Sequence, residues 1–256
     1  MLDYSISEHR LLGRANRTSF NWQIPSPEDV LTELLTKASL QGESRQVARI
    51  TPNRSGIGRF LDEAATLMRK SRFNEAIDTL ERGLSVEPDN MAAWEQVAAC
   101  NLELRQPKKA IEALDHILMI QPLAGRIWGD KAYLHLLLNE DIEGINALKE
   151  SLKLRPRNAR DWQLLGITLM LNEELEEASV AFERGLLLDP NSASTWYNYA
   201  VCHFLDDDYD AALEAAEYAF SIEPMLEESA EDWIDYVRSE VLASEEDIDE
   251  EEAEAG

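Results

Sequence analysis

The chain has 256 residues, of which 45% are hydrophobic, and its formal net charge at pH 7 is −26. No apolar run approaches the roughly 18 residues that indicate a membrane span, and the first residues lack the apolar stretch of a secretory signal. The negative charge argues against binding to nucleic acid or to anionic membrane surfaces. Without a signal, we expect a cytoplasmic protein.

Residues 1–56 form an N-terminal extension that is close to neutral and carries several arginines. Residues 1–25 show no sustained period and are expected to pack on the rest of the chain or to form a partly disordered arm. A helix is predicted near residues 27–41, because Ser26 is a good N-cap, Pro27 suits the first helical position, and apolar residues follow at helical spacing. Residues 43–56 contain Pro, Ser and Gly and are expected to be a linker.

From Ile57 to Leu226 the sequence repeats itself every 34 residues. Two independent series share this period, the prolines Pro88, Pro122, Pro156, Pro190 and Pro224 and the aromatics Phe60, Trp94, Trp128, Trp162 and Trp196. Such a period indicates a stacked repeat architecture. It divides residues 57–226 into five repeats, 57–90, 91–124, 125–158, 159–192 and 193–226, and positions 1 to 34 are numbered within each.

Residue size along each repeat predicts two helices packed against each other. Positions 8 and 20 hold Ala or Gly in all five repeats, while position 4 is always aromatic and position 24 is large in four of them. Small residues allow two helices to approach closely, and large ones fill the space beside the contact. Proline at position 32 cannot continue a helix. We therefore expect helix A at about positions 2–14, a short turn, and helix B at about positions 17–30.

This pattern resembles the tetratricopeptide repeat (TPR) family, and the resemblance covers residues 57–226. It implies an all-α protein, a right-handed α-solenoid of five TPR helix pairs, to which flanking N- and C-terminal helices are added. It also implies a concave groove, lined mainly by helix A, that holds a peptide or helix of a partner protein. Position 11 departs from the family's usual aromatic in three repeats, where it is Asn101, His135 and His203.

The TPR pattern places positions 2, 5, 9, 12 and 13 of helix A on the concave side. In the last three repeats these positions are mostly apolar, with an arginine at position 2 in two of them. The predicted partner-binding residues are Arg126, Tyr133, Leu136, Arg160, Gln163, Ile167, Met170, Tyr197, Val201 and Phe204. An apolar groove of this kind suits an apolar peptide or amphipathic helix. The alternative is that positions 9, 12 and 13 pack against neighbouring helices.

Two further expectations concern this groove. The basic and amide residues with which some TPR modules grip the C-terminal carboxylate of heat-shock chaperones are missing here, so no such grip is predicted. The helix near residues 27–41 has an apolar face, which either caps the first repeat or plugs the groove.

The C-terminal region is predicted to be a capping helix followed by a charged tail. Residues 227–242 are predicted to form a capping helix with an apolar side, composed of Trp233, Ile234, Tyr236, Val237 and Leu242. Residues 243–256 are an acidic run expected to be disordered. This tail either keeps the protein soluble or acts through charge, by recruiting a basic partner or by folding back on Arg45, Arg49, Arg54 and Arg59.

No residue pattern indicates catalysis or a cofactor. The four histidines lack the spacing of metal ligands, and the chain has no glycine-rich phosphate loop. Cys100 and Cys202 share one repeat position three periods apart, which stacking would separate too far for a disulfide, so both are expected to be buried and reduced. The tryptophan series is interpreted as packing, not as a platform for stacking bases.

The sequence therefore predicts a non-catalytic protein–protein interaction module, an adaptor or assembly scaffold without cofactor or metal. The alternative is a chaperone-like holder of client segments. A permanent stoichiometric complex would favour the scaffold, and transient binding to many apolar clients would favour the holder. The oligomeric state is left open.

Overall fold

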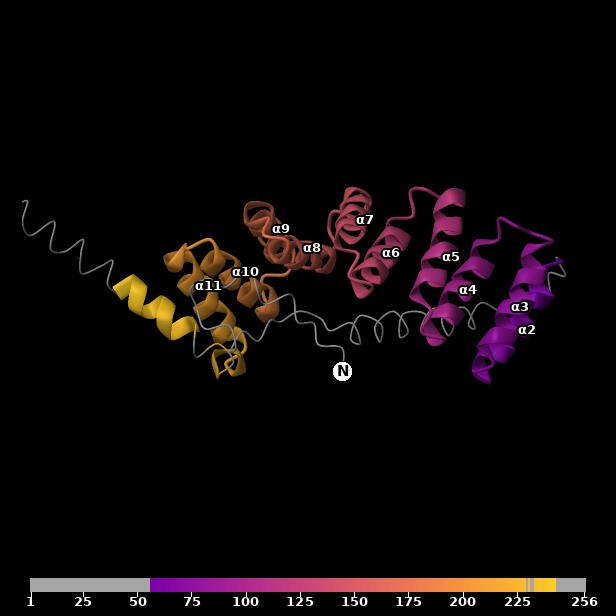
Figure 1. Ribbon diagram of the computed structural model, residues 1–256, viewed down its shortest axis with the longest axis horizontal. Helices are drawn as coiled ribbons and strands as arrows, with labels where there is room; N and C mark the ends of the chain where they lie inside the picture. The colour runs from indigo at the N-terminus through magenta and orange to yellow at the C-terminus, as the bar shows by residue number, and fades with distance from the viewer. Residues whose placement is uncertain (1–55, 229, 231–232, 243–256) are drawn as a thin grey trace, which may run out of the picture. The chain divides into compact units, whose positions relative to one another are not determined.

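The computed structural model describes residues 56–228, 230 and 233–242, and these residues contain helices and turns but no strand (Figure 1). They fall into two compact units, residues 56–156 and residues 157–242. The predicted helix near residues 27–41, the rest of the N-terminal extension and the acidic tail lie outside the described residues.

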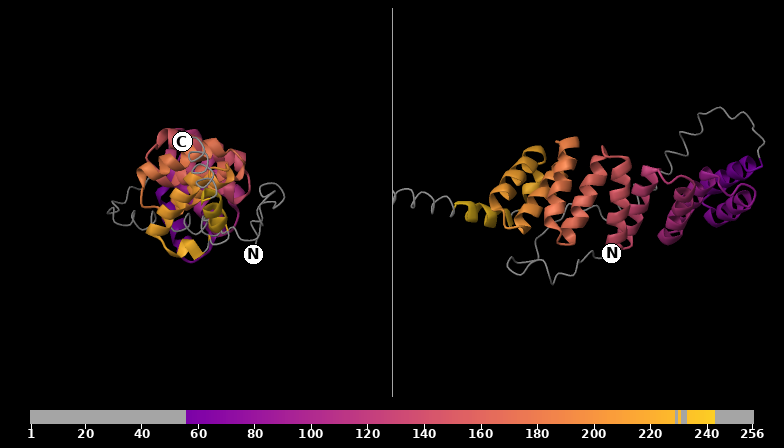
Figure 2. Two further views of the ribbon diagram at one scale, coloured as in Figure 1. Left: turned by 90° about the vertical axis from the view of Figure 1, so that its left-hand side faces the viewer. Right: turned by 90° about the horizontal axis from the view of Figure 1, so that it is seen from above.

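The first unit, whose colour begins at indigo in Figure 2, contains three helix pairs. They are formed by α2 (Gly58–Arg69) and α3 (Phe73–Leu84), α4 (Met91–Glu103) and α5 (Pro107–Ile120), and α6 (Gly125–Leu137) and α7 (Asp141–Leu154). The partners of each pair contact each other, and α3 contacts α4 as α5 contacts α6, so the pairs are stacked in chain order.

The second unit contains two helix pairs and a C-terminal helical segment. The pairs are α8 (Ala159–Leu171) with α9 (Leu175–Leu188), and α10 (Ala193–Leu205) with α11 (Tyr209–Ile222). Helix α9 also contacts α10. Residues 225–228, 230 and 233–242 are helical as well. The predicted all-α architecture of helix pairs is confirmed, with α2, α4, α6, α8 and α10 as the A helices.

Small residues mark the places where the two helices of a pair meet closely. A Cβ atom on Gly166 of α8 would lie 2.8 Å from Cδ1 of Phe182 on α9, closer than real contacts allow. Position 8 must therefore be small where position 24 carries a ring. This confirms the packing role predicted for the small positions.

The tryptophan and proline series are linked by hydrogen bonds. The indole Nε1 at position 4 donates to the carbonyl oxygen of the proline six residues earlier, at 2.8 Å from Trp94 to Pro88, 2.9 Å from Trp128 to Pro122 and 2.9 Å from Trp196 to Pro190. The proline that ends one repeat thus anchors the first helix of the next. This bond fixes the six-residue spacing between each of these prolines and the tryptophan that follows it.

Every A helix ends in the same turn. The residue at position 15 has a left-handed backbone, with φ of 56° at Ser71, 56° at Arg105, 57° at Asn139, 64° at Glu173 and 61° at Asp207. In the second repeat the N–H of Gln106 donates to the carbonyl of Asn101 at 2.8 Å, and that of Arg105 to Leu102 at 2.9 Å. These two bonds are those of a Schellman motif, which satisfies carbonyl groups at a helix end.

The described helices include none that is long and apolar enough to cross a membrane. Cys100 and Cys202 are free and buried, as predicted. Burial raises the pKa of each thiol to about 12.

Candidate partner-binding face

The inner face is defined here as positions 2, 5, 9, 12 and 13 of each A helix. The ten predicted binding residues lie on three A helices and are divided between the two units. Helix α6 of the first unit carries Arg126, Tyr133 and Leu136, whereas α8 carries Arg160, Gln163, Ile167 and Met170 and α10 carries Tyr197, Val201 and Phe204. The structure thus brings seven of them together in the second unit.

Most of these side chains are enclosed. The exposed fractions of the seven apolar members are 3% for Tyr133, 9% for Leu136, 1% for Ile167, 0% for Met170, 1% for Tyr197, 1% for Val201 and 7% for Phe204. The sequence predicted an apolar binding groove here, with packing of positions 9, 12 and 13 against neighbouring helices as the alternative, because periodicity assigns a residue to a face but does not show what covers it. A partner can contact these side chains only after the segments that cover them have moved.

Leu136 is enclosed by the partner helix of its own pair. A Cβ atom on Gly144 of α7 would overlap the end of the Leu136 side chain, with Cγ at 2.7 Å. Leu136 therefore fills the space that Gly144 leaves between α6 and α7. For this residue the structure shows packing against a neighbouring helix, the alternative considered for position 12.

The inner face of α10 is covered by the C-terminal helical segment. The indole Nε1 of Trp233 donates to the hydroxyl oxygen of Tyr197 at 3.3 Å, and the ring centroids of Trp233 and Phe204 are 5.5 Å apart. Tyr236 adds an edge contact to Phe204 at 6.3 Å. Trp233 itself is buried, with 4% of its surface exposed. The sequence predicted an amphipathic helix here but not the face on which it lies.

Burial has an electrostatic consequence at this contact. It raises the pKa of Tyr197 above its ordinary value, and the hydrogen bond from Trp233 opposes that shift. The hydroxyl is therefore neutral at physiological pH, and its oxygen accepts a hydrogen bond from the indole N–H.

The polar members of the predicted site have partners within the chain. Arg126 Nη2 lies 2.7 Å from Glu95 Oε1 on α4, and Arg126 Nη1 lies 2.8 Å from Asp130 Oδ2 on α6. Gln163 Nε2 donates to Ser194 Oγ at 3.0 Å, which joins α8 to α10. Arg160, in the first turn of α8, is exposed. These contacts connect neighbouring A helices along the inner face.

Part of the inner face is open at position 13. Leu137, Leu171 and Leu205 are partly exposed near the ends of α6, α8 and α10. They are the apolar inner-face residues of the last three repeats that a partner can reach directly.

The histidines at position 11 have a structural role. His135 Nδ1 lies 2.8 Å from Glu140 Oε2, and His203 Nδ1 lies 3.4 Å from Asp208 Oδ2. In both repeats the acid caps or precedes helix B, so the pair joins the end of helix A to the start of helix B. Among the described residues there is no group of side chains that could hold a metal ion.

The chain matches one known family in two places. Models of the tetratricopeptide repeat match residues 67–132 and residues 181–214. None of the curated proteins matches the chain.

Several solved structures have a similar fold. A MamA structure shares 18% identity and a TM-score of 0.61, covering 66% of this chain and 92% of its own. MamA (residues 41 to the end) from Desulfovibrio magneticus RS-1 shares 19% identity and a TM-score of 0.58, covering 66% and 96%. YrrB, described as a TPR protein with an unusual peptide-binding site, shares 18% identity and a TM-score of 0.59, covering 74% and 92%. With the family matches and the 34-residue period of its helix pairs, the chain is a tetratricopeptide repeat protein.

Proposed function

We propose that the chain is a non-catalytic protein-interaction module, an adaptor or assembly scaffold, whose inner face in the second unit binds an amphipathic helix or apolar peptide of a partner protein. One observation carries this proposal. The inner face of α10 already holds an amphipathic helix, because Trp233 of the C-terminal segment packs against Tyr197 and Phe204.

The chemistry of this face suits such a ligand. Ile167, Met170 and Val201 extend the buried apolar layer of the inner face from α10 to α8. A helix that presents one aromatic and several aliphatic side chains at a spacing of three to four residues is recognised by a surface of this kind. YrrB, a TPR protein with an unusual peptide-binding site, has a similar fold, which supports the same proposal.

A partner would begin at the exposed end of the face and extend inward. Leu171 and Leu205 give it a first apolar contact. Displacement of the C-terminal helix would then expose Tyr197 and Phe204. The partner must therefore contribute contacts that replace those of Trp233.

Substitutions that test this proposal must leave the fold intact. Replacing Met170 by Asp is unsuitable because its side chain is 0% exposed, and an unpaired carboxylate there would unfold the unit. The double variant Leu171→Arg, Leu205→Arg changes partly exposed positions instead. Its matched control is Val180→Arg, Leu187→Arg on α9, where the side chains are 53% and 75% exposed.

The probe is a fluorescein-labelled 18-residue amphipathic helical peptide with one Phe and four Leu on a single face. Binding to the full-length protein and its variants is measured by anisotropy, and circular dichroism checks their folding. We expect the inner-face variant to bind at least tenfold more weakly and the α9 control to bind within twofold of the natural chain. Equal binding by all three proteins, or loss only in the α9 control, would refute the proposal.

A further inference from the structure

Charge is distributed unevenly over the turns that join helix A to helix B. Positions 13–19 of the first two repeats contain six basic residues and two acids, and the basic ones are Arg69, Lys70, Arg72, Arg105, Lys108 and Lys109. The same positions of the last two repeats contain eight acids and no base. In a chain with a net charge of −26, the first two turns are a basic exception.

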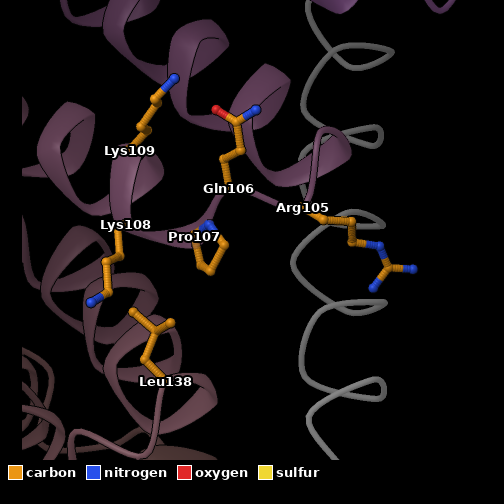
Figure 3. Close-up of a pocket in the computed structure, with 6 residues that line it drawn as sticks. All are labelled: Arg105, Gln106, Pro107, Lys108, Lys109 and Leu138. Carbon is orange, nitrogen blue, oxygen red and sulfur yellow. The ribbon is translucent and has the colours of Figure 1, made fainter. Parts of the chain in front are cut away.

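The second of these turns forms a depression of about 520 Å³. It is lined by Arg105, Gln106, Pro107, Lys108, Lys109 and Leu138, and it is named the basic turn pocket here. Figure 3 shows Pro107 near its centre, with Arg105, Lys108 and Lys109 directed away from one another. Pro107 and Leu138 supply its apolar surface.

Among the described residues, only one carboxylate forms an ion pair with the cations of the basic turn pocket. Lys108 has only a long contact to a carboxylate, 3.8 Å to Glu140, and its side chain is 73% exposed. Arg105 and Lys109 form no ion pair with any other described residue. The left-handed backbone of Arg105 and the start of α5 at Pro107 fix the direction of this turn.

This geometry favours an extended acidic peptide over a compact anion. Three cations that diverge cannot converge on a single phosphate, but they can pair with carboxylates spaced along a strand. The apolar surface requires one aliphatic side chain among those acids. The tail of this chain has such a sequence, because Ile248 stands between Asp247 and Asp249 in a run of acids from Glu245 to Glu252.

We propose that residues 245–252 of a second copy of this chain bind the basic turn pocket, with Ile248 against Pro107 and Leu138. The tail's acids pair with Arg105, Lys108 and Lys109. This surface is distinct from the inner face, and the inference does not depend on the partner bound there.

The length of the tail favours a second copy. Ile248 is only the sixth residue after Leu242, a span of roughly 20 Å when fully extended. The C-terminal helix lies against α10. Helix α10 in turn contacts α9 of the preceding helix pair. With helices packed about 8–10 Å apart, the tail would be fully extended before it left its own unit.

Carbodiimide cross-linking tests this interaction on the full-length protein, because it joins a lysine amine directly to a carboxylate. A mixture of unlabelled and ¹⁵N-labelled chains distinguishes links between two copies from links within one. We expect links from Lys108 and Lys109 to residues 245–252, and in an equimolar mixture about half of them should join a labelled to an unlabelled chain, as random pairing between two copies requires. Their yield should exceed that at Lys153, a 67% exposed control on α7, by at least fivefold.

Variants and salt make the test specific. Ile248→Ser should reduce the yield of these links at least threefold without changing the tail's charge. In 0.5 M NaCl, the Arg105→Glu variant should form none of them. Links confined to single chains would show binding within one copy and overturn the proposal. Equal cross-linking yields at Lys109 and Lys153 would show non-specific attraction and would overturn the proposal. An unchanged yield in Ile248→Ser would exclude binding of Ile248 in the basic turn pocket and would overturn it as well.

Discussion

The indole Nε1 of Trp233 lies 3.3 Å from the hydroxyl oxygen of Tyr197, and this contact places the C-terminal helix on the inner face of α10. Replacing Trp233 by Ala should destabilise the second unit by about 3–5 kcal/mol, because a buried ring is removed and a cavity remains. Leu242→Ala, at a 60% exposed position of the same helix, should change stability by less than about 0.5 kcal/mol. Urea unfolding measures both. Equal effects would mean that Trp233 does not anchor the helix.

A second prediction concerns the space between α6 and α7. Gly144→Ala should cost about 1–3 kcal/mol, because the added methyl group overlaps Leu136. In a Leu136→Ala background the same change should cost little, since the overlapping atoms are gone. Thermal unfolding of the four proteins gives the coupling. Additive effects would contradict the placement of Leu136 in the helix pair.

A third prediction concerns the ion pair between neighbouring A helices. Glu95→Gln and Arg126→Gln should show a coupling of about 0.5–1 kcal/mol, kept small because the Arg126 side chain is 41% exposed and therefore screened by solvent. The coupling should fall as NaCl rises. The exposed pair of Lys153 and Glu150 on α7 is the control and should couple more weakly. A coupling that salt leaves unchanged would argue against an ion pair at Arg126.

The left-handed turns offer a way to stabilise the protein. Glu173 has φ of 64°, so Glu173→Gly removes backbone strain. After the greater conformational entropy of glycine in the unfolded chain is subtracted, the variant should stabilise the second unit by about 0.5–1 kcal/mol. The neighbouring Asn172 has φ of −92°, and Asn172→Gly should destabilise it. Chemical unfolding compares the two. Destabilisation by both variants would rule out relief of strain at Glu173.

The two thiols should be inert in the folded protein. Burial raises the pKa of Cys100 and Cys202 to about 12, so the folded state favours the neutral thiol and only about one thiolate in ten thousand is present at pH 8. Reactivity should rise as the pH approaches 12. Alkylation by iodoacetamide, followed by mass spectrometry, should therefore be at least a hundredfold slower than in urea. Fast alkylation of the native protein would show that the thiols are accessible.

The repeat architecture could be predicted from the sequence because its causes are local and periodic. Trp94 and Pro88 are six residues apart and joined by one hydrogen bond, so their spacing recurs in register. Gly166 and Phe182 likewise record a close contact within one helix pair. Such contacts leave a size pattern that sequence analysis can find.

Other features of the structure are harder to predict from the sequence. The left-handed residues, such as Arg105 and Asp207, are not glycines, so no residue type marks the turn. The enclosure of Tyr197 and Phe204 depends on a helix about 30 residues further along the chain, whose docking face no period reveals. The pairing of His203 with Asp208 could have been found, because an acid follows each position-11 histidine by five residues.

The claim that the inner face of the second unit holds amphipathic helices is tested most directly at Trp233 itself. In protein labelled with 5-fluorotryptophan, the ¹⁹F resonance of Trp233 can be assigned from the Trp233→Phe variant and followed while the Phe-containing probe peptide is added. We predict that saturation shifts the Trp233 resonance toward that of a solvent-exposed ring, leaves those of Trp94 and Trp128 unchanged, and is prevented by Leu171→Arg with Leu205→Arg. Binding of the peptide with no change at Trp233 would contradict the account.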